Sequence, residues 1–328
     1  MSNSGFSGGG FNRNNNPFGG SGFGGGFPNP FANRGNGKRR VSPLTITFIV
    51  LFILSSVLIS LSGFYADLLW FRSVGFVDVW QTSLFTKIYL FFGFGLITSA
   101  FITLNIYLAF RKRPIYVPVT VEADNLERYR AQLEPIRRLA GIGIFLVIFY
   151  FAGTAGSRFW QQWLLFQNST EFGQVDPQFG LDISFFAFKL PMYQAFISWG
   201  ISLVLISTVA AVGVHYLYGG IRPQAQTERT TTAARVQISV LLGFLVLLKA
   251  VAYWFDRYAL ALKESRLITG LTYTDVNAVL PAKAILAAIA VICSLLFFAN
   301  IIRLSWVLPA AGSAFLVISS VLIAGLYP

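Results

Sequence analysis

Seven apolar stretches fill the chain between about Leu44 and Tyr327, and each is long enough to cross a lipid bilayer. A helical crossing of the hydrocarbon core needs about 20 consecutive apolar residues. The core offers no water to satisfy a free backbone N–H or C=O group, so such a stretch must be helical. The sequence therefore predicts an all-α, polytopic helical membrane protein. Its seven transmembrane helices are expected at residues 44–63, 84–110, 139–156, 195–218, 233–255, 282–302 and 307–327.

The composition supports a membrane protein and argues against a nucleic-acid-binding protein. Apolar residues make up 55% of the chain and charged residues 12%, whereas soluble domains carry about 25% charged residues. The formal net charge is +12. The basic residues crowd into the tail and alternate loops instead of forming one stripe, so we expect no nucleic-acid partner. The expected partner is the lipid bilayer.

The loops between the predicted helices differ in basic charge. Sixteen Lys and Arg residues lie in the N-terminal tail and in the second, fourth and sixth loops, whereas six lie in the other loops. An excess of Lys and Arg marks the cytoplasmic side of a membrane protein. The pattern predicts a multi-pass protein of the cell (plasma) membrane with its N-terminus in the cytoplasm and its C-terminus outside.

The chain divides into two predicted parts. Residues 1–43 form a cytoplasmic tail whose first 37 residues contain 12 Gly, 8 Asn and 6 Phe. This composition provides too little branched apolar surface to offset the entropy lost on ordering, so we expect the tail to be disordered. Residues 44–328 form the seven-helix transmembrane domain.

Few ionisable side chains lie inside the predicted helices. Lys87 and Lys283 lie close to the outer helix ends, where long side chains can reach the interface. Lys249 lies deeper and shares a helix face with Asp256, so we expect Asp256 to attract its ammonium. No Asp or Glu lies in the middle of a predicted helix, which counts against a proton- or sodium-coupled carrier. His215 is expected to form hydrogen bonds and not to bind a metal.

The sequence carries no motif for catalysis or for a cofactor. It contains no Gly-rich phosphate loop ending in Lys-Ser/Thr, no His-Glu-x-x-His and no Gly-x-Ser-x-Gly. The single cysteine, Cys293, lacks a partner for a disulfide or a zinc site. Asp176 and Asp182 provide fewer oxygens than the six to eight that Ca²⁺ requires. We therefore expect no cofactor or metal, and an enzyme would need its chemistry outside this chain.

The predicted outer loops carry the most distinctive motifs. They read Leu-Trp-Phe-Arg-Ser-Val-Gly-Phe from Leu69, Asp-Pro-Gln-Phe-Gly-Leu-Asp-Ile-Ser-Phe-Phe from Asp176, and Tyr-Thr-Asp-Val-Asn-Ala-Val-Leu-Pro-Ala-Lys from Tyr273. Aromatic residues in such loops favour the headgroup layer, or they pack beneath another domain.

Together these three motifs resemble the large actinobacterial-type multi-pass membrane proteins grouped as uncharacterised protein family 0182. The resemblance covers about Val41 to the end of the chain. It implies seven N-terminal crossings followed by a long extracytoplasmic region, so this chain is expected to be the membrane part alone or a truncated form. It implies no established reaction and no catalytic residue.

Two functions follow as hypotheses. The first is a non-enzymatic module of the cell envelope that anchors and orients its own extracytoplasmic region or other envelope proteins. The second is a transporter or lipid-handling channel for an anionic envelope substrate, because cationic side chains near the outer leaflet suit such a substrate. The residues expected to contact a partner or substrate are Lys249, Asp256, Lys283, Trp70, Phe71, Asp176, Asp182, Phe185 and Phe186.

Overall fold

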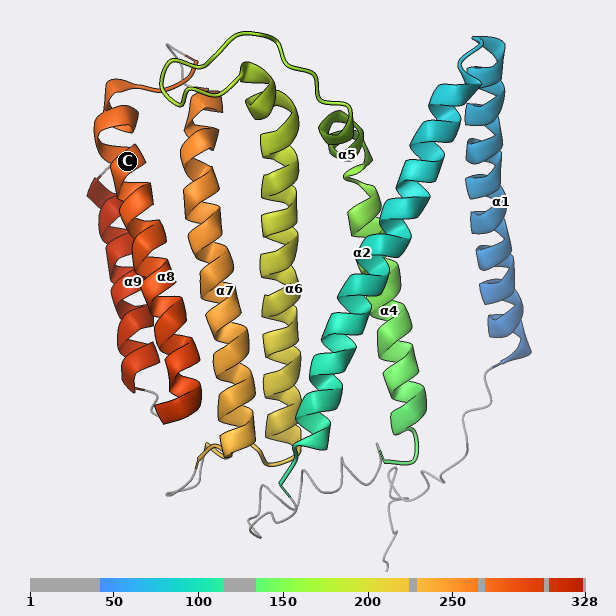
Figure 1. Ribbon diagram of the computed structural model, residues 1–328. Helices are drawn as coiled ribbons and strands as arrows, with labels where there is room; N and C mark the ends of the chain where they lie inside the picture. The colour runs from blue at the N-terminus through green and yellow to red at the C-terminus, as the bar shows by residue number, and fades with distance from the viewer. Residues whose placement is uncertain (1–41, 115–133, 224–228, 265–268, 304–306, 327–328) are drawn as a thin grey trace, which may run out of the picture. The chain divides into compact units, whose positions relative to one another are not determined.

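The computed structural model describes residues 42–114, 134–223, 229–264, 269–303 and 307–326, which form helices joined by loops (Figure 1). All but the last two residues of the predicted tail, residues 1–43, lie outside the described residues. The α-helices are α1 (Pro43–Ser73), α2 (Val77–Arg111), α4 (Arg137–Ser157), α5 (Trp160–Gln167), α6 (Leu190–Leu217), α7 (Thr232–Ala259), α8 (Leu280–Arg303) and α9 (Val307–Leu326). The described residues also include two π-helical turns, η1 (Phe185–Lys189) and η3 (Asp275–Val279), and one 3₁₀ turn, η2 (Leu260–Leu262).

Among the residues that the structure describes, six helices are long and apolar enough to cross a membrane. They cover Pro43–Ser73, Val77–Arg111, Arg137–Ser157, Phe185–Leu217, Thr232–Leu262 and Asp275–Ile302. These match the first six predicted helices, and the prediction of an all-α fold with helices long and apolar enough to cross a membrane is confirmed. The seventh predicted helix corresponds to α9, whose described apolar stretch, Ala310–Leu322, is shorter. The count of seven crossings therefore stays a prediction.

The first helix continues well past its predicted limit. The prediction ended it at residue 63, but α1 reaches Ser73, and α2 starts at Val77 and not at residue 84. The predicted limits followed hydropathy, whereas a helix continues through polar residues until the backbone turns away. Gly75, with φ of 77°, provides that turn in a conformation that glycine adopts readily. Trp70 and Phe71, predicted in a loop, therefore lie in the last turn of α1.

The part of the chain up to Asp67 forms a unit of its own. Its helical residues are exposed, and the hydroxyl groups of Thr47, Ser55, Ser56 and Ser60 donate to backbone carbonyls about one turn earlier. Thr47 Oγ1 donates to the Pro43 carbonyl at 3.0 Å, and Ser56 Oγ donates to the Phe52 carbonyl at 2.8 Å. A helix that satisfies its polar groups internally in this way suits a lipid environment.

In the unit from Leu68 onward, neighbouring helices pack in the order α4, α2, α6, α7, α8 and α9. Helices α2, α6 and α8 run downward in Figure 1, and α4, α7 and α9 run upward. We call the end at which α6 and α8 begin the upper end and the opposite end the lower end. The upper end carries the loop 168–184 and the described loop residues 263–264 and 269–274.

Glycine allows α2 and α4 to approach closely. A Cβ atom added at Gly95 of α2 would lie 2.8 Å from the backbone oxygen of Phe149 in α4. A Cβ atom added at Gly153 of α4 would lie 2.8 Å from the backbone oxygen of Phe91 in α2. Small residues at such contacts let two helix backbones pack together.

Polar side chains link α2, α6 and α7 inside this unit. Trp199 Nε1 donates to Thr98 Oγ1 at 3.0 Å. Near the lower end, Gln237 Nε2 donates to the Asn105 backbone carbonyl at 2.9 Å, and Gln237 Oε1 lies 3.0 Å from His215 Nε2. His215 is thus a buried hydrogen-bonding residue, as its position predicted. These bonds fix the register of three neighbouring helices.

We predict that Gly95→Ala destabilises the protein by about 1–3 kcal/mol, because the added methyl group meets the backbone of α4. The matched control is Gly93→Ala on the same helix, where an added Cβ meets nothing within 4 Å. Thermal unfolding of the detergent-purified protein measures both effects. Equal melting temperatures for the two variants would contradict the close packing.

Candidate functional site

Helices α6 and α8 begin in the same way at the upper end. Each has a capping residue, Asp182 or Thr272, eight positions before a buried leucine, Leu190 or Leu280. Proline follows each leucine, and a π-helical turn precedes it. Proline lacks an N–H donor, and its ring clashes with the carbonyl four residues earlier, so the wider π turn accommodates it. The upper loops therefore lead into two equivalent, ordered helix starts.

Asp182 holds the first helix start. Its carboxylate accepts from the backbone N–H groups of Phe172 (3.1 Å), Gly173 (2.9 Å) and Ser184 (2.8 Å). Hydrogen bonds from the side chain and backbone of Ser184, and then from Phe172, lower the pKa of Asp182 from its ordinary value to about 2. Asp176 accepts two backbone N–H groups of its own turn, at 3.0 and 2.7 Å. Both predicted carboxylates thus order the loop.

No metal centre is evident in the part of the chain that the structure describes, where no three His, Cys, Asp or Glu side chains are placed to share an ion. The N–H groups around Asp182 point the positive ends of their dipoles at its oxygens. This arrangement stabilises the carboxylate itself. It leaves Asp176 and Asp182 with a structural role as acceptors.

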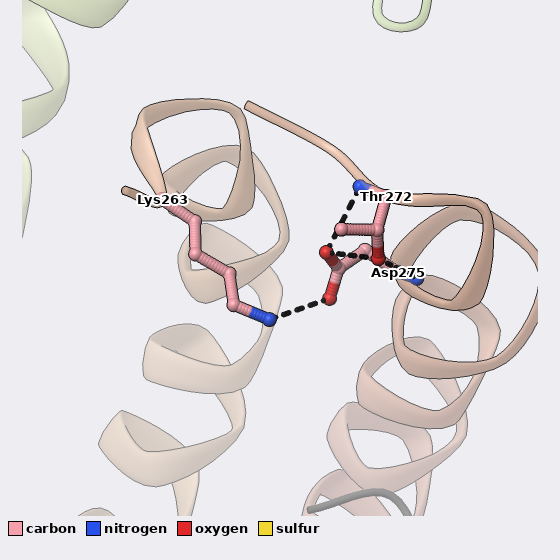
Figure 2. Close-up of polar contacts among 3 residues, drawn as sticks. All are labelled: Lys263, Thr272 and Asp275. Atoms are coloured by element: carbon pink, nitrogen blue, oxygen red, sulfur yellow. Dashed lines mark hydrogen bonds and ion pairs between the residues drawn. The ribbon is translucent and has the colours of Figure 1, made fainter. Parts of the chain in front are cut away.

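Thr272 and Asp275 hold the second helix start as a capping box (Figure 2). The Asp275 N–H group donates to Thr272 Oγ1 at 3.1 Å. In return, the N–H and hydroxyl groups of Thr272 donate to Asp275 Oδ2 at 3.0 and 2.7 Å. Lys263 Nζ lies 3.0 Å from Asp275 Oδ1, whose side chain is only 2% exposed. The lysine therefore neutralises a carboxylate that would otherwise be buried without a partner.

Aromatic side chains pack against the first helix start. Phe185 lies 5.5 Å from Tyr258 and 5.3 Å from Phe186, in T-shaped contacts between ring centroids. Tyr193 lies 5.3 Å from Phe255. Phe186 is 4% exposed, so its replacement would disturb folding before it disturbed docking. Phe185 and Phe186, predicted in a loop, belong to the π turn that leads into α6, because that helix begins earlier than hydropathy indicated.

Trp70 and Phe71 form a separate feature. They make a T-shaped pair at 4.8 Å, and Trp70 is 59% exposed. The pair lies at the turn between α1 and α2 and contributes no residue to the two helix starts.

A groove of about 320 Å³ lies between α6 and α7. Lys249 and Asp256 both line it, and Asp256 forms an ion pair with Lys283 of α8 at 3.5 Å. The structure thus gathers the three charged residues that the sequence singled out. The expectation that Asp256 attracts the Lys249 ammonium was wrong. Asp256 pairs with Lys283 instead, and the Lys249 ammonium lies 5.3 Å from the Tyr253 ring centroid. The groove is lined by Gln194, Ile197, Ser198, Ile201, Lys249, Ala252, Phe255 and Asp256.

Sequence reasoning missed four residues of these sites: Lys263, Thr272, Gln194 and Ser198. A Thr-x-x-Asp spacing marks a capping box, so the pair Thr272 and Asp275 had a readable signal. Gln194 and Ser198 share one face of α6 at a spacing of four residues. That this face meets Lys249 depends on helix packing, which the local sequence does not encode.

Comparison with known proteins places the chain in a family. The family model for the uncharacterised protein family UPF0182 matches residues 44–328. A UPF0182 protein of Streptomyces coelicolor is 47% identical over 311 residues, which are 93% of this chain and 31% of that protein. Another, from Nocardioides sp., is 43% identical over 293 residues, or 89% of this chain and 29% of that protein. No solved structure matches.

This chain spans less than a third of the length of these relatives. The family match covers every helix described above, from the first turn of α1 to α9. The resemblance inferred from the three loop motifs is confirmed. The chain belongs to the uncharacterised protein family UPF0182.

Proposed function

We propose that this chain is a membrane module of the cell envelope that anchors and orients an extracytoplasmic region. It crosses the plasma membrane seven times, with α9 as the last crossing, its N-terminus in the cytoplasm and its upper end outside. Six long apolar helices and the alternation of basic charge between loops support this topology. The relatives are more than three times as long as the matched segment, and their remaining length supplies a region to be held.

One observation carries this proposal: the ordered upper end exposes a set of large apolar side chains. Ile183 and Tyr273 hold equivalent positions in it, directly after the two capping residues. Large apolar side chains gathered on an exposed surface mark an interaction site. The upper apolar surface consists of Phe172, Val175, Ile183, Leu262 and Tyr273, which are between 41% and 84% exposed.

The caps support this role because they order the surface before a partner arrives. Asp182 bonds directly to the backbone of Phe172, and the Lys263–Asp275 ion pair ties the loop after α7 to the start of α8. A preordered surface loses less conformational entropy when a partner binds. The ordered upper loops can therefore hold a partner in a fixed orientation, which a flexible tether cannot do.

The α6–α7 groove favours a second function, the handling of an anionic envelope substrate by a transporter or lipid channel. The supporting observation is that an exposed lysine, Lys249, lines a groove that also contains polar side chains. Under this second function, the groove binds the substrate, and the upper loops only hold the helices in place.

We predict that Glu171→Cys reacts with a membrane-impermeant maleimide on intact cells, because loop 168–184 faces outside in the proposed topology. The control, Pro223→Cys in the lower loop after α6, should react only after permeabilisation. Both positions are exposed, and the native Cys293 is 3% exposed and gives little background. Labelling of both variants on intact cells would refute the topology.

We predict that Tyr273→Ser weakens docking about tenfold, because aromatic side chains dominate the energy of such contacts. The measurement is co-purification of this chain with the separately produced region of the Streptomyces coelicolor relative that the chain does not cover. Tyr107→Ser is the matched control, since Tyr107 is 53% exposed but lies near the lower end of α2. Equal capture by all variants, or no capture by the unmodified chain, would refute the anchoring function.

We predict that Asp182→Ala speeds hydrogen exchange about fivefold at the amides of Phe172, Gly173 and Ser184, because three donors lose their acceptor. Exchange in the loop 269–274 should stay unchanged.

The lowered pKa of Asp182 means that the ionised carboxylate stabilises the loop fully above about pH 4 and loses this effect as the pH falls through about 2. Loss of protection already at pH 5 would contradict this assignment.

A further inference from the structure

We propose that the α6–α7 groove binds the phosphodiester headgroup of a monoanionic phospholipid, with Lys249 as the cation that holds it. This inference rests on the second function above, because it names the substrate class of the same groove. Four observations support it: the position of Lys249, the unpaired polar groups beside it, the balance of charge and the apolar walls.

Lys249 lies near the middle of its helix and lacks a carboxylate partner. Helix α7 runs from Thr232 to Ala259, so Lys249 is about four residues beyond the midpoint, or about 5 Å along the axis. Its side chain is exposed, and no carboxylate of the described residues lies within ion-pair distance of its ammonium. A lone cationic charge at this depth is costly in lipid. An anion bound beside it removes that cost.

Two further polar side chains line the same groove. The Gln194 amide and the Ser198 hydroxyl make no side-chain hydrogen bond within the part of the chain that the structure describes. Together with Lys249 they supply N–H, O–H and ammonium donors to one space. A phosphodiester offers several oxygen acceptors, and bonds from charged donors to phosphate are strong.

The charges of the groove match a single negative charge. Asp256 is neutralised by Lys283 at 3.5 Å, so Lys249 alone remains unbalanced. A phosphodiester with an uncharged headgroup substituent carries one negative charge and balances it. A zwitterionic lipid would add an ammonium to a groove whose unbalanced charge is already that of Lys249.

The apolar walls suit a lipid better than a free anion. Ile197, Ile201 and Ala252 line the groove beside the polar groups, and Phe255 borders it toward the aromatic residues of the upper end. The core of a bilayer is about 30 Å thick, so phosphates normally lie about 15 Å from its centre. A phosphate that reaches Lys249 has left the headgroup layer, and its acyl chains remain against the isoleucines.

The test is native mass spectrometry of the full, detergent-purified chain titrated with phosphatidylglycerol and phosphatidylcholine. We expect tighter binding of phosphatidylglycerol, a loss of about tenfold in Lys249→Leu, and retention in Lys249→Arg. The matched control is Lys87→Leu, since Lys87 is also a helix lysine stacked on an aromatic ring, 4.8 Å from the Trp160 centroid. Its binding should equal that of the unmodified chain.

Three results would overturn the inference: unchanged binding by Lys249→Leu, the same loss in Lys87→Leu, or equal affinity for phosphatidylcholine. Binding of oleate as tight as that of phosphatidylglycerol would also overturn it, because the groove would then recognise any monoanionic amphiphile. Should Lys249→Leu fail to fold, Gln194→Leu combined with Ser198→Ala tests the same groove and should weaken binding several-fold.

A separate measurement distinguishes binding from movement. Vesicles that contain the protein and fluorescent phosphatidylglycerol are treated with dithionite, which bleaches only the accessible leaflet. Bleaching beyond about half of the signal supports the second function. Lipid binding without extra bleaching would refute the second function and leave the binding inference intact. Extra bleaching without phosphatidylglycerol binding would refute the binding inference and leave the second function intact.

Discussion

The first N–H groups of a helix have no carbonyl partner within it. This requirement explains how the upper end is built. Asp182 supplies acceptors at the start of α6, and Thr272 with Asp275 supplies them at the start of α8. Once these carboxylates are in place, Lys263 is needed to neutralise the buried one. The aromatic packing and the exposed apolar residues of the upper loops depend on these fixed starts.

The long apolar stretches made the helical fold predictable, because lipid leaves a backbone no alternative. The limits of the helices were less predictable. Hydropathy detects the apolar segment, whereas Gly75 and the capping residues determine where each helix ends or begins. For this reason Trp70, Phe185 and Phe186 lie in helical turns although a loop was predicted.

The candidate site was predictable only in part. A charge inside an apolar helix is conspicuous, so Lys249, Asp256 and Lys283 could be selected from the sequence, and they do lie at one groove. Their pairing was not predictable, since the partner of Asp256 comes from the neighbouring helix and not from its own. Gln194 and Ser198 looked like ordinary polar residues until helix packing brought their face to Lys249.

In the proposed topology, the depth of Lys249 would also make the groove sensitive to voltage. In the proposed orientation its position lies about 10 Å inside a core of about 30 Å, or about one third of the electric field. A unit charge that crosses the whole field gains or loses about 2.3 kcal/mol per 100 mV, so an anion entering from outside would change by about 0.8 kcal/mol. A negative cell interior opposes this entry. Occupancy of the groove would then fall about fourfold per 100 mV in an energised cell and recover on depolarisation.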